Sequence, residues 1–180
     1  MNKNNRKQYN DLLAALRAEY QKWQTIHDLG WQDPFTPDGA NMKLVRDHII
    51  SFRKNIQELC EEQDLPKPEE LALPLPPVVP NNYMAGSENI RTDARNALKI
   101  YEEDIEYQYI LQIRDLPDVQ NGRAQKEIKA TIRLVSSLRD AIEADDLLTM
   151  RQYGRNVDIY TDAIHRAAEK CKSLLEKKSM

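Results

Sequence analysis

Apolar side chains recur every three or four positions through two long segments near the start of the chain. Between residues 5 and 28 they are Tyr9, Leu12, Leu13, Leu16, Tyr20, Trp23 and Ile26. Between residues 40 and 63 they are Leu44, Val45, Ile49, Phe52, Ile56, Leu59 and Cys60. This spacing places each set on one face of a helix. Because the intervening segment contains Gly30, Pro34, Pro37 and Gly39, we predict two helices that form a hairpin with a long loop.

The next segment is rich in proline. Six of the nine prolines fall between residues 66 and 80, in the run PKPEELALPLPPVVP. Since proline has no N–H to donate, neither a long helix nor a central strand is expected there. We predict an extended, polyproline-like linker, or an arm laid across a neighbouring surface. The arm is favoured because the run also carries the apolar side chains Leu71, Leu73, Leu75, Val78 and Val79.

Helical periodicity returns after residue 86. A third helix, capped by Ser87, carries Ile90, Ala94, Ala97, Leu98, Tyr101, Ile105 and Ile113 and ends before Pro117. A fourth carries Ile128, Ile132, Val135, Leu138 and Ile142, and a fifth runs from Leu147 to Leu175. The short join between them predicts antiparallel neighbours. The fold class is therefore predicted to be all-α with about five helices: a hairpin at 1–64, the proline-rich arm at 65–86 and a helical bundle at 87–180, as separate parts or as one compact domain.

Composition supports a helical protein of the cytoplasm. Charged residues make up 31% of the 180 residues and glycine only five, which is typical of helices with one apolar stripe and a wide solvated face. No apolar run approaches the ~18 residues of a membrane span, and no apolar stretch follows the charged N-terminus as in a signal peptide. Cys60 and Cys171 form no CxxC pair and are expected to be reduced core residues. We expect a cytoplasmic location in a bacterial host cell.

The stretch DPFTPDGANMKLVRDHIISFRKN, residues 33–55, has two interpretations. Asp38 is placed to cap the second helix, with Asn41 as a rival cap. Alternatively, the helix N-terminus is a ligand-binding loop that attracts anions. A phosphate loop needs several glycines and a following Lys-Ser or Lys-Thr, which are absent here. We therefore predict a structural cap, with an apolar plug formed by Trp31, Pro34, Phe35 and Pro37.

No catalytic or metal-binding motif is present in the sequence. The three histidines are scattered, and no HExxH, paired Glu-x-x-His or cysteine cluster accompanies them. Asp162 and His165 share a helix face, but Arg155 and Arg166 nearby make a salt-bridged surface the better interpretation. We predict no enzyme activity, no cofactor and no metal.

Charge is unevenly distributed over the C-terminal half. Residues 87–118 hold four basic and eight acidic side chains, whereas residues 119–180 hold twelve basic and nine acidic ones. Opposite charges in neighbouring segments indicate either an internal match between packed helices, which we favour, or two binding faces. The candidate partner-binding acidic patch is Glu102, Glu103, Asp104 and Glu106. The candidate nucleic-acid contacts are Arg123, Lys126, Lys129 and Arg133. Few aromatic side chains lie near them in the sequence for stacking on bases.

The stretches FTPDGANMKLVRDHI and NNYMAGSENIR resemble proteins of gut-bacterial mobile elements, and in size and style the chain resembles a type II-A anti-CRISPR protein. This resemblance implies a non-catalytic inhibitor that binds a CRISPR effector nuclease with its guide RNA and blocks DNA recognition or cleavage. It also implies some affinity for double-stranded DNA. The alternatives are a helical adaptor that binds a partner helix or forms a homodimer, and a weak DNA-binding protein of a mobile element. No membrane partner is expected.

Overall fold

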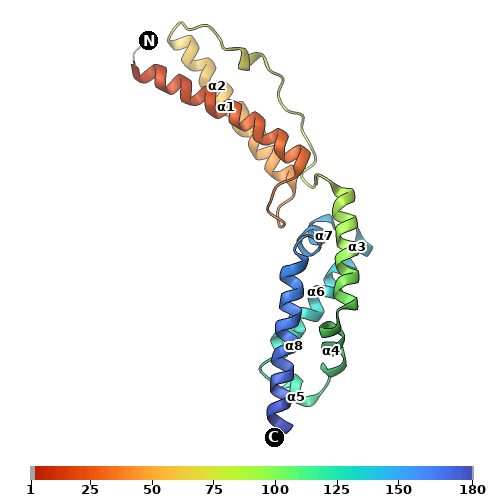
Figure 1. Cartoon of the computed structure of the whole chain (residues 1–180). Helices are drawn as coiled ribbons and strands as arrows, with labels where there is room; N and C mark the ends of the chain where they lie inside the picture. Colours follow the sequence, from red (N-terminus) through yellow and green to blue (C-terminus); the bar gives the residue numbers. More distant parts are fainter. Residues whose placement is uncertain (1–2, 180) are drawn as a thin grey trace. The chain divides into compact units, whose positions relative to one another are not determined.

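The computed structural model describes residues 3–179, which form helices and no strands (Figure 1). The chain divides into two compact units between Gly86 and Ser87. The first unit contains α1 (Lys3–Leu29), α2 (Asp38–Glu62) and a short 3-10 helix, η1 (Glu69–Ala72). The second contains α3 (Ser87–Glu103), α4 (Ile105–Ile113), α5 (Pro117–Gln120), α6 (Gln125–Ala144), α7 (Leu147–Gly154) and α8 (Val157–Ser179). The all-α class is confirmed.

The predicted number of about five helices is wrong, because two predicted helices are each divided and α5 was not foreseen. The apolar stripe from Ile90 to Ile113 crosses a break at Asp104, whose backbone is extended (φ −65°, ψ 127°). The Asp104 carboxylate accepts the N–H groups of Glu106 and Tyr107 at 2.9 and 3.1 Å and so caps α4. The predicted fifth helix is likewise interrupted between Gly154 and Val157. Ile105 keeps the apolar spacing of α3 across the break at Asp104, so periodicity alone does not detect it. Its predicted place on the buried stripe is wrong, because Ile105 is 82% exposed and α4 buries Tyr107, Ile110 and Ile113 instead.

The first unit is a helical hairpin in which the apolar faces of α1 and α2 pack against each other. Its buried cluster consists of Leu16, Trp23, Ile26, Met42, Val45, Ile49, Ile56 and Cys60. Each large aliphatic side chain fully buried in this way contributes about 1.5–3 kcal/mol. One predicted stripe position is wrong: Leu44 is 55% exposed, because it lies on the opposite side of α2 from Met42, Val45 and Ile49.

The proline-rich segment lies along this hairpin as an ordered arm (Figure 1). Proline removes N–H donors but leaves carbonyl oxygens, and two arginines of α2 donate to them. Arg53 donates to the carbonyls of Leu73 at 2.6 Å and Leu71 at 2.7 Å, and Arg46 donates to that of Pro76 at 2.8 Å. The arm is therefore fixed by side chains of α2 in place of a backbone ladder.

The second unit packs α3, α4, α6, α7 and α8 around one apolar core. The members of this core that are wholly shielded from solvent include Ile90, Ala94, Ala97, Tyr101, Ile110, Val135, Leu138, Ile164, Ala168 and Cys171. Helix α7 crosses α3 closely, since a Cβ at Gly154 would lie 2.9 Å from the backbone of Ala94. Helices α6 and α8 run antiparallel (Figure 1), and an ion pair joins Glu127 near the start of α6 to Lys170 in the second half of α8.

Candidate functional site

The stretch around Asp38 is a structural junction within the first unit. Pro37, not Asp38, is the N-cap residue of α2, and no side chain caps this helix. The Asp38 side chain is fully buried and accepts the N–H groups of Trp31 at 2.7 Å and Ala85 at 2.6 Å. The predicted cap is therefore wrong in its partners: the carboxylate ties the loop after α1 and the end of the arm to the start of α2.

The glycine beside Asp38 has a related role. A Cβ at Gly39 would lie 2.0 Å from the carbonyl oxygen of Pro80, and the Gly39 N–H donates to the carbonyl of Tyr83 at 2.9 Å. Only glycine lets the backbone of the arm approach the helix this closely. Asp38 and Gly39 together therefore hold the end of the arm, around residues 80–85, against the start of α2.

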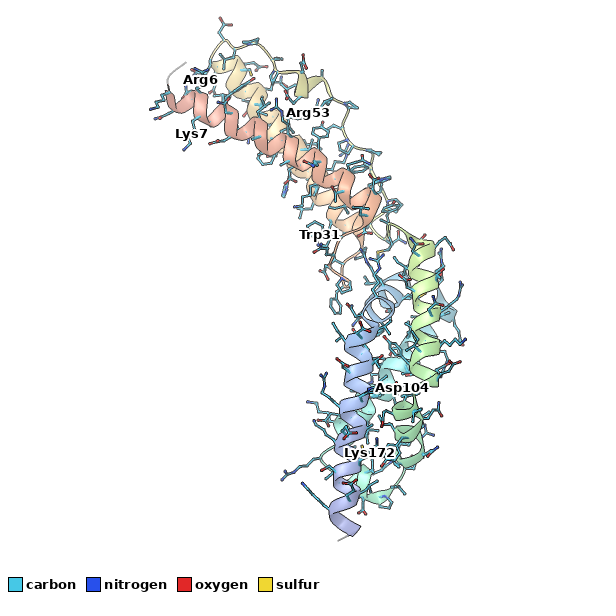
Figure 2. The ribbon with its side chains drawn as sticks, viewed as in Figure 1. Arg6, Lys7, Trp31, Arg53, Asp104 and Lys172 are labelled. Carbon is cyan, nitrogen blue, oxygen red and sulfur yellow. The ribbon has the colours of Figure 1, made fainter. Side chains whose placement is uncertain are left out.

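The predicted apolar plug is only partly present. Trp31 packs against the buried cluster, whereas Phe35 is 63% exposed. The Lys22 ammonium lies 5.3 Å from the centre of the Trp31 ring, within the range of a cation–π interaction. Trp31 and Lys22, with Leu29, line an open groove of about 570 Å³ on α1. Figure 2 labels Trp31 at the end of the hairpin.

Each of the four candidate acidic side chains lies near a basic side chain of the second unit. Glu102 pairs with Arg139 at 2.6 Å, and Glu103 lies 4.0 Å from Lys99. Asp104 pairs with His165 at 2.8 Å, and Glu106 pairs with Lys172 at 2.7 Å. Asp104 and Lys172, labelled in Figure 2, come from the α3–α4 break and from α8. The pairs of Glu102, Asp104 and Glu106 join residues 87–118 to residues 119–180, as the predicted internal match requires, whereas the contact of Glu103 with Lys99 lies within α3.

The pairing of Asp104 is reflected in its pKa. Burial raises the pKa of the carboxyl, but hydrogen bonds from His165 and from the N–H groups of Tyr107 and Glu106 outweigh burial and lower it overall. In the neighbouring pair, a hydrogen bond to the Glu106 carboxylate raises the pKa of Lys172. Both groups are therefore held in their charged forms by contacts within the unit.

The four candidate basic side chains form a different kind of surface, which we call the basic face: Arg123, Lys126, Lys129 and Arg133. Arg123 lies in the turn before α6, and the other three are on the exposed side of that helix. Among residues 3–179 no carboxylate forms an ion pair with any of them. From Lys126 to Arg133 the helix rises about 10 Å, so the charges form a short stripe.

Other reactive groups are dispersed or shielded. Within the described residues, no three histidine, cysteine or carboxylate side chains converge as metal ligands. Cys60 and Cys171 are buried free thiols, and burial raises the pKa of both, which disfavours the nucleophilic thiolate. In the same part of the chain, no helix has the length and apolarity needed to cross a membrane.

No protein-family model, curated protein or solved structure matches the chain. Sequence reasoning missed the role of Arg46 and Arg53 in holding the arm, because neither arginine stands in a motif and both contacts are long-range. It also predicted a salt-bridged surface that includes Arg166 of α8, but Arg166 is exposed and, among the described side chains, has no carboxylate partner.

Proposed function

We propose that this protein acts by binding, without chemistry of its own, and that the basic face contacts the phosphate backbone of a nucleic acid. The observation that carries the proposal is the difference between the two charged sets. The acidic side chains are matched within the second unit, whereas Arg123, Lys126, Lys129 and Arg133 are exposed and unmatched. Exposed cations without internal partners are the groups that exchange counterions for phosphates.

Binding of this kind is sequence-independent and strongly sensitive to salt. Each phosphate contact on duplex DNA contributes about −0.9 to the slope of log K against log salt, so four contacts give a slope of about −3.6. Base-specific readout needs side chains that reach base edges in a groove. The four cations of the basic face are suited to backbone contact, since lysine meets phosphate as a point charge and arginine binds it bidentately.

The partner that we propose is the complex of a CRISPR effector nuclease with its guide RNA, in line with the resemblance to type II-A anti-CRISPR proteins. Such nucleases hold the RNA–DNA heteroduplex in a channel and contact its backbone. A protein that covers exposed phosphates of the guide or of the target DNA would block recognition or cleavage by occupation. Mimicry of phosphates by Glu102, Glu103, Asp104 and Glu106 is the weaker mode, because these carboxylates already have partners.

The test is a salt titration of binding to a fluorescently labelled 20-base-pair duplex, measured by anisotropy. The variant replaces all four residues of the basic face with glutamine. A matched control replaces two other arginines and two other lysines, all exposed and equally without an ion-pair partner in the described chain: Arg6, Lys7, Lys43 and Arg95. Both variants have the same net charge.

We expect the basic-face variant to lose most of the affinity and about three units of the salt slope, whereas the control keeps at least two thirds of the slope. Equal losses in both variants would mean that binding follows net charge alone. If neither the duplex nor a guide-loaded effector nuclease bound at micromolar concentration, the proposal would fail and the adaptor alternative would replace it.

A further inference from the structure

A groove of about 320 Å³ runs between α6 and α8 in the second unit. Half of its ten lining residues are alanine or aliphatic, namely Ala130, Leu134, Ala163, Ile164 and Ala167. The ion pair between Glu127 and Lys170 bridges the two helices at one end, and Tyr160 lies at the other. The groove is therefore an apolar trough with defined ends.

The apolar surface continues beyond the groove along α8. Ile159 stands one helical turn before Ala163, on the same face, and is 63% exposed. The alanines of the floor would let another backbone approach closely, because their side chains end at Cβ. An unfilled trough continued by an exposed isoleucine is a surface that a second apolar element would cover favourably.

The margins of the groove are cationic. Lys126 and Arg133 of α6 flank Ala130 at i−4 and i+3, and Arg166 of α8 lines the groove itself. None of the three has an ion-pair partner among the described residues. The one carboxylate of the lining, Glu127, is engaged by Lys170. An occupant that complements both floor and margins is apolar on one face and acidic along its flanks.

From these features we propose that the α6–α8 groove binds an acidic amphipathic helix of a protein partner. The groove extends along α8 from Tyr160 to Lys170, about 15 Å, which matches about three turns of a docked helix. In the docked helix, leucine-like residues at i, i+3, i+4 and i+7 would lie on the alanine floor of the groove, and its glutamates or aspartates would face Lys126, Arg133 and Arg166. This site goes beyond the proposed function, since it recognises protein. It shares Lys126 and Arg133 with the basic face, but the variants that test it, Ala130→Trp and Arg166→Glu, leave the basic face unaltered, so either proposal can fail without the other.

The experiment uses the full-length chain and two synthetic 14-residue helical peptides labelled with a fluorophore. The peptides share one leucine stripe and carry either glutamates or lysines on the flanks. We expect the glutamate peptide to bind at least about tenfold more tightly, a preference that salt reduces. Ala130→Trp, which fills the groove from an exposed position, is expected to weaken binding at least about tenfold. The control Ala14→Trp, an exposed alanine of α1, leaves binding unchanged.

A second variant keeps the proposal testable if Ala130→Trp disturbs folding, which far-UV circular dichroism detects. Arg166→Glu alters only the charge of the margin, and we expect it to lower the preference for the glutamate peptide about fivefold or more. Equal binding of the two peptides, or no effect of either groove variant, would overturn the proposal. It would also be overturned by self-association that Ala130→Trp abolishes, which would make a second copy the occupant, or by loss of duplex binding in Ala130→Trp without loss of peptide binding.

Discussion

Removal of the Asp38 carboxylate is expected to destabilise the first unit far more than loss of a helix cap would. An exposed N-cap contributes about 0.5–2 kcal/mol. Asp38 is instead fully buried and accepts two N–H groups, from Trp31 and Ala85, at 2.7 and 2.6 Å. A hydrogen bond to a charged group contributes about 1.5–3 kcal/mol, and each donor left unsatisfied in the interior adds to the loss. We therefore expect Asp38→Ala to cost about 3–5 kcal/mol.

Tryptophan fluorescence during urea unfolding measures this effect selectively. Both tryptophans of the chain, Trp23 and Trp31, precede Gly86, so their emission reports on the first unit. With a denaturant slope of about 2 kcal/mol per molar, a loss of 4 kcal/mol lowers the midpoint by about 2 M. The matched control is Asp47→Ala, an exposed aspartate of α2 without an ion pair among the described residues, which should stay within about 0.5 kcal/mol.

A loss of less than about 1 kcal/mol in Asp38→Ala would contradict a structural role of the carboxylate, since removal of its hydrogen bonds to two buried N–H groups should destabilise the unit by more than that. A different conclusion would follow if Asp38→Ala left the stability unchanged but abolished binding to nucleic acid or nuclease. That result would make residues 33–55 a recognition element and not a junction of the fold.

Three further results are expected from single substitutions. Gly39→Ala should cost about 3 kcal/mol in the same urea assay, because its Cβ meets the Pro80 carbonyl. Val135→Ala, at a wholly buried position of α6, should cost about 2–4 kcal/mol in urea unfolding followed by circular dichroism, and a loss below about 0.5 kcal/mol would mean that this stripe is not core. Because the folded-state pKa of Asp104 is lowered, its contribution is fully present above the unfolded pKa and is lost as pH falls through the folded one. The stability gap between wild type and Asp104→Asn should therefore close below about pH 4, and a gap that persists at pH 2 would contradict the role of the carboxylate.

The helical class and most buried positions follow from spacing in the sequence. Leu16, Ile49, Val135 and Ile164 stand on predicted stripes and are wholly buried, because amphipathic periodicity records which face of a helix is shielded. Periodicity does not reveal a short break between two helices in the same way. Asp104 ends one helix and caps the next within a single residue. Ile105 continues the apolar spacing of α3, yet it is 82% exposed, and the buried positions after the break are Tyr107, Ile110 and Ile113.

The contacts of the junction and of the arm could not be read from the sequence. Asp38 looks like a cap because aspartate before a helix commonly is one. Its true partners, Trp31 and Ala85, are brought to it by the turn after α1 and by the return of the arm. The basic face was visible as Lys126, Lys129 and Arg133 at helical spacing, but only the structure tells which charges are already matched. The groove depends on how α6 and α8 pack, which no local pattern specifies.

The most direct test of occupation through the basic face is a cleavage titration with a purified type II-A effector nuclease loaded with guide RNA. We expect inhibition to rise in proportion to added protein until the complex is saturated, with nuclease and guide intact by mass spectrometry. The variant with glutamine at Arg123, Lys126, Lys129 and Arg133 should inhibit weakly, whereas the control altered at Arg6, Lys7, Lys43 and Arg95 should inhibit as wild type does. Inhibition by catalytic amounts of protein, a modified nuclease or a cut guide, or equal inhibition by both variants, would contradict the account.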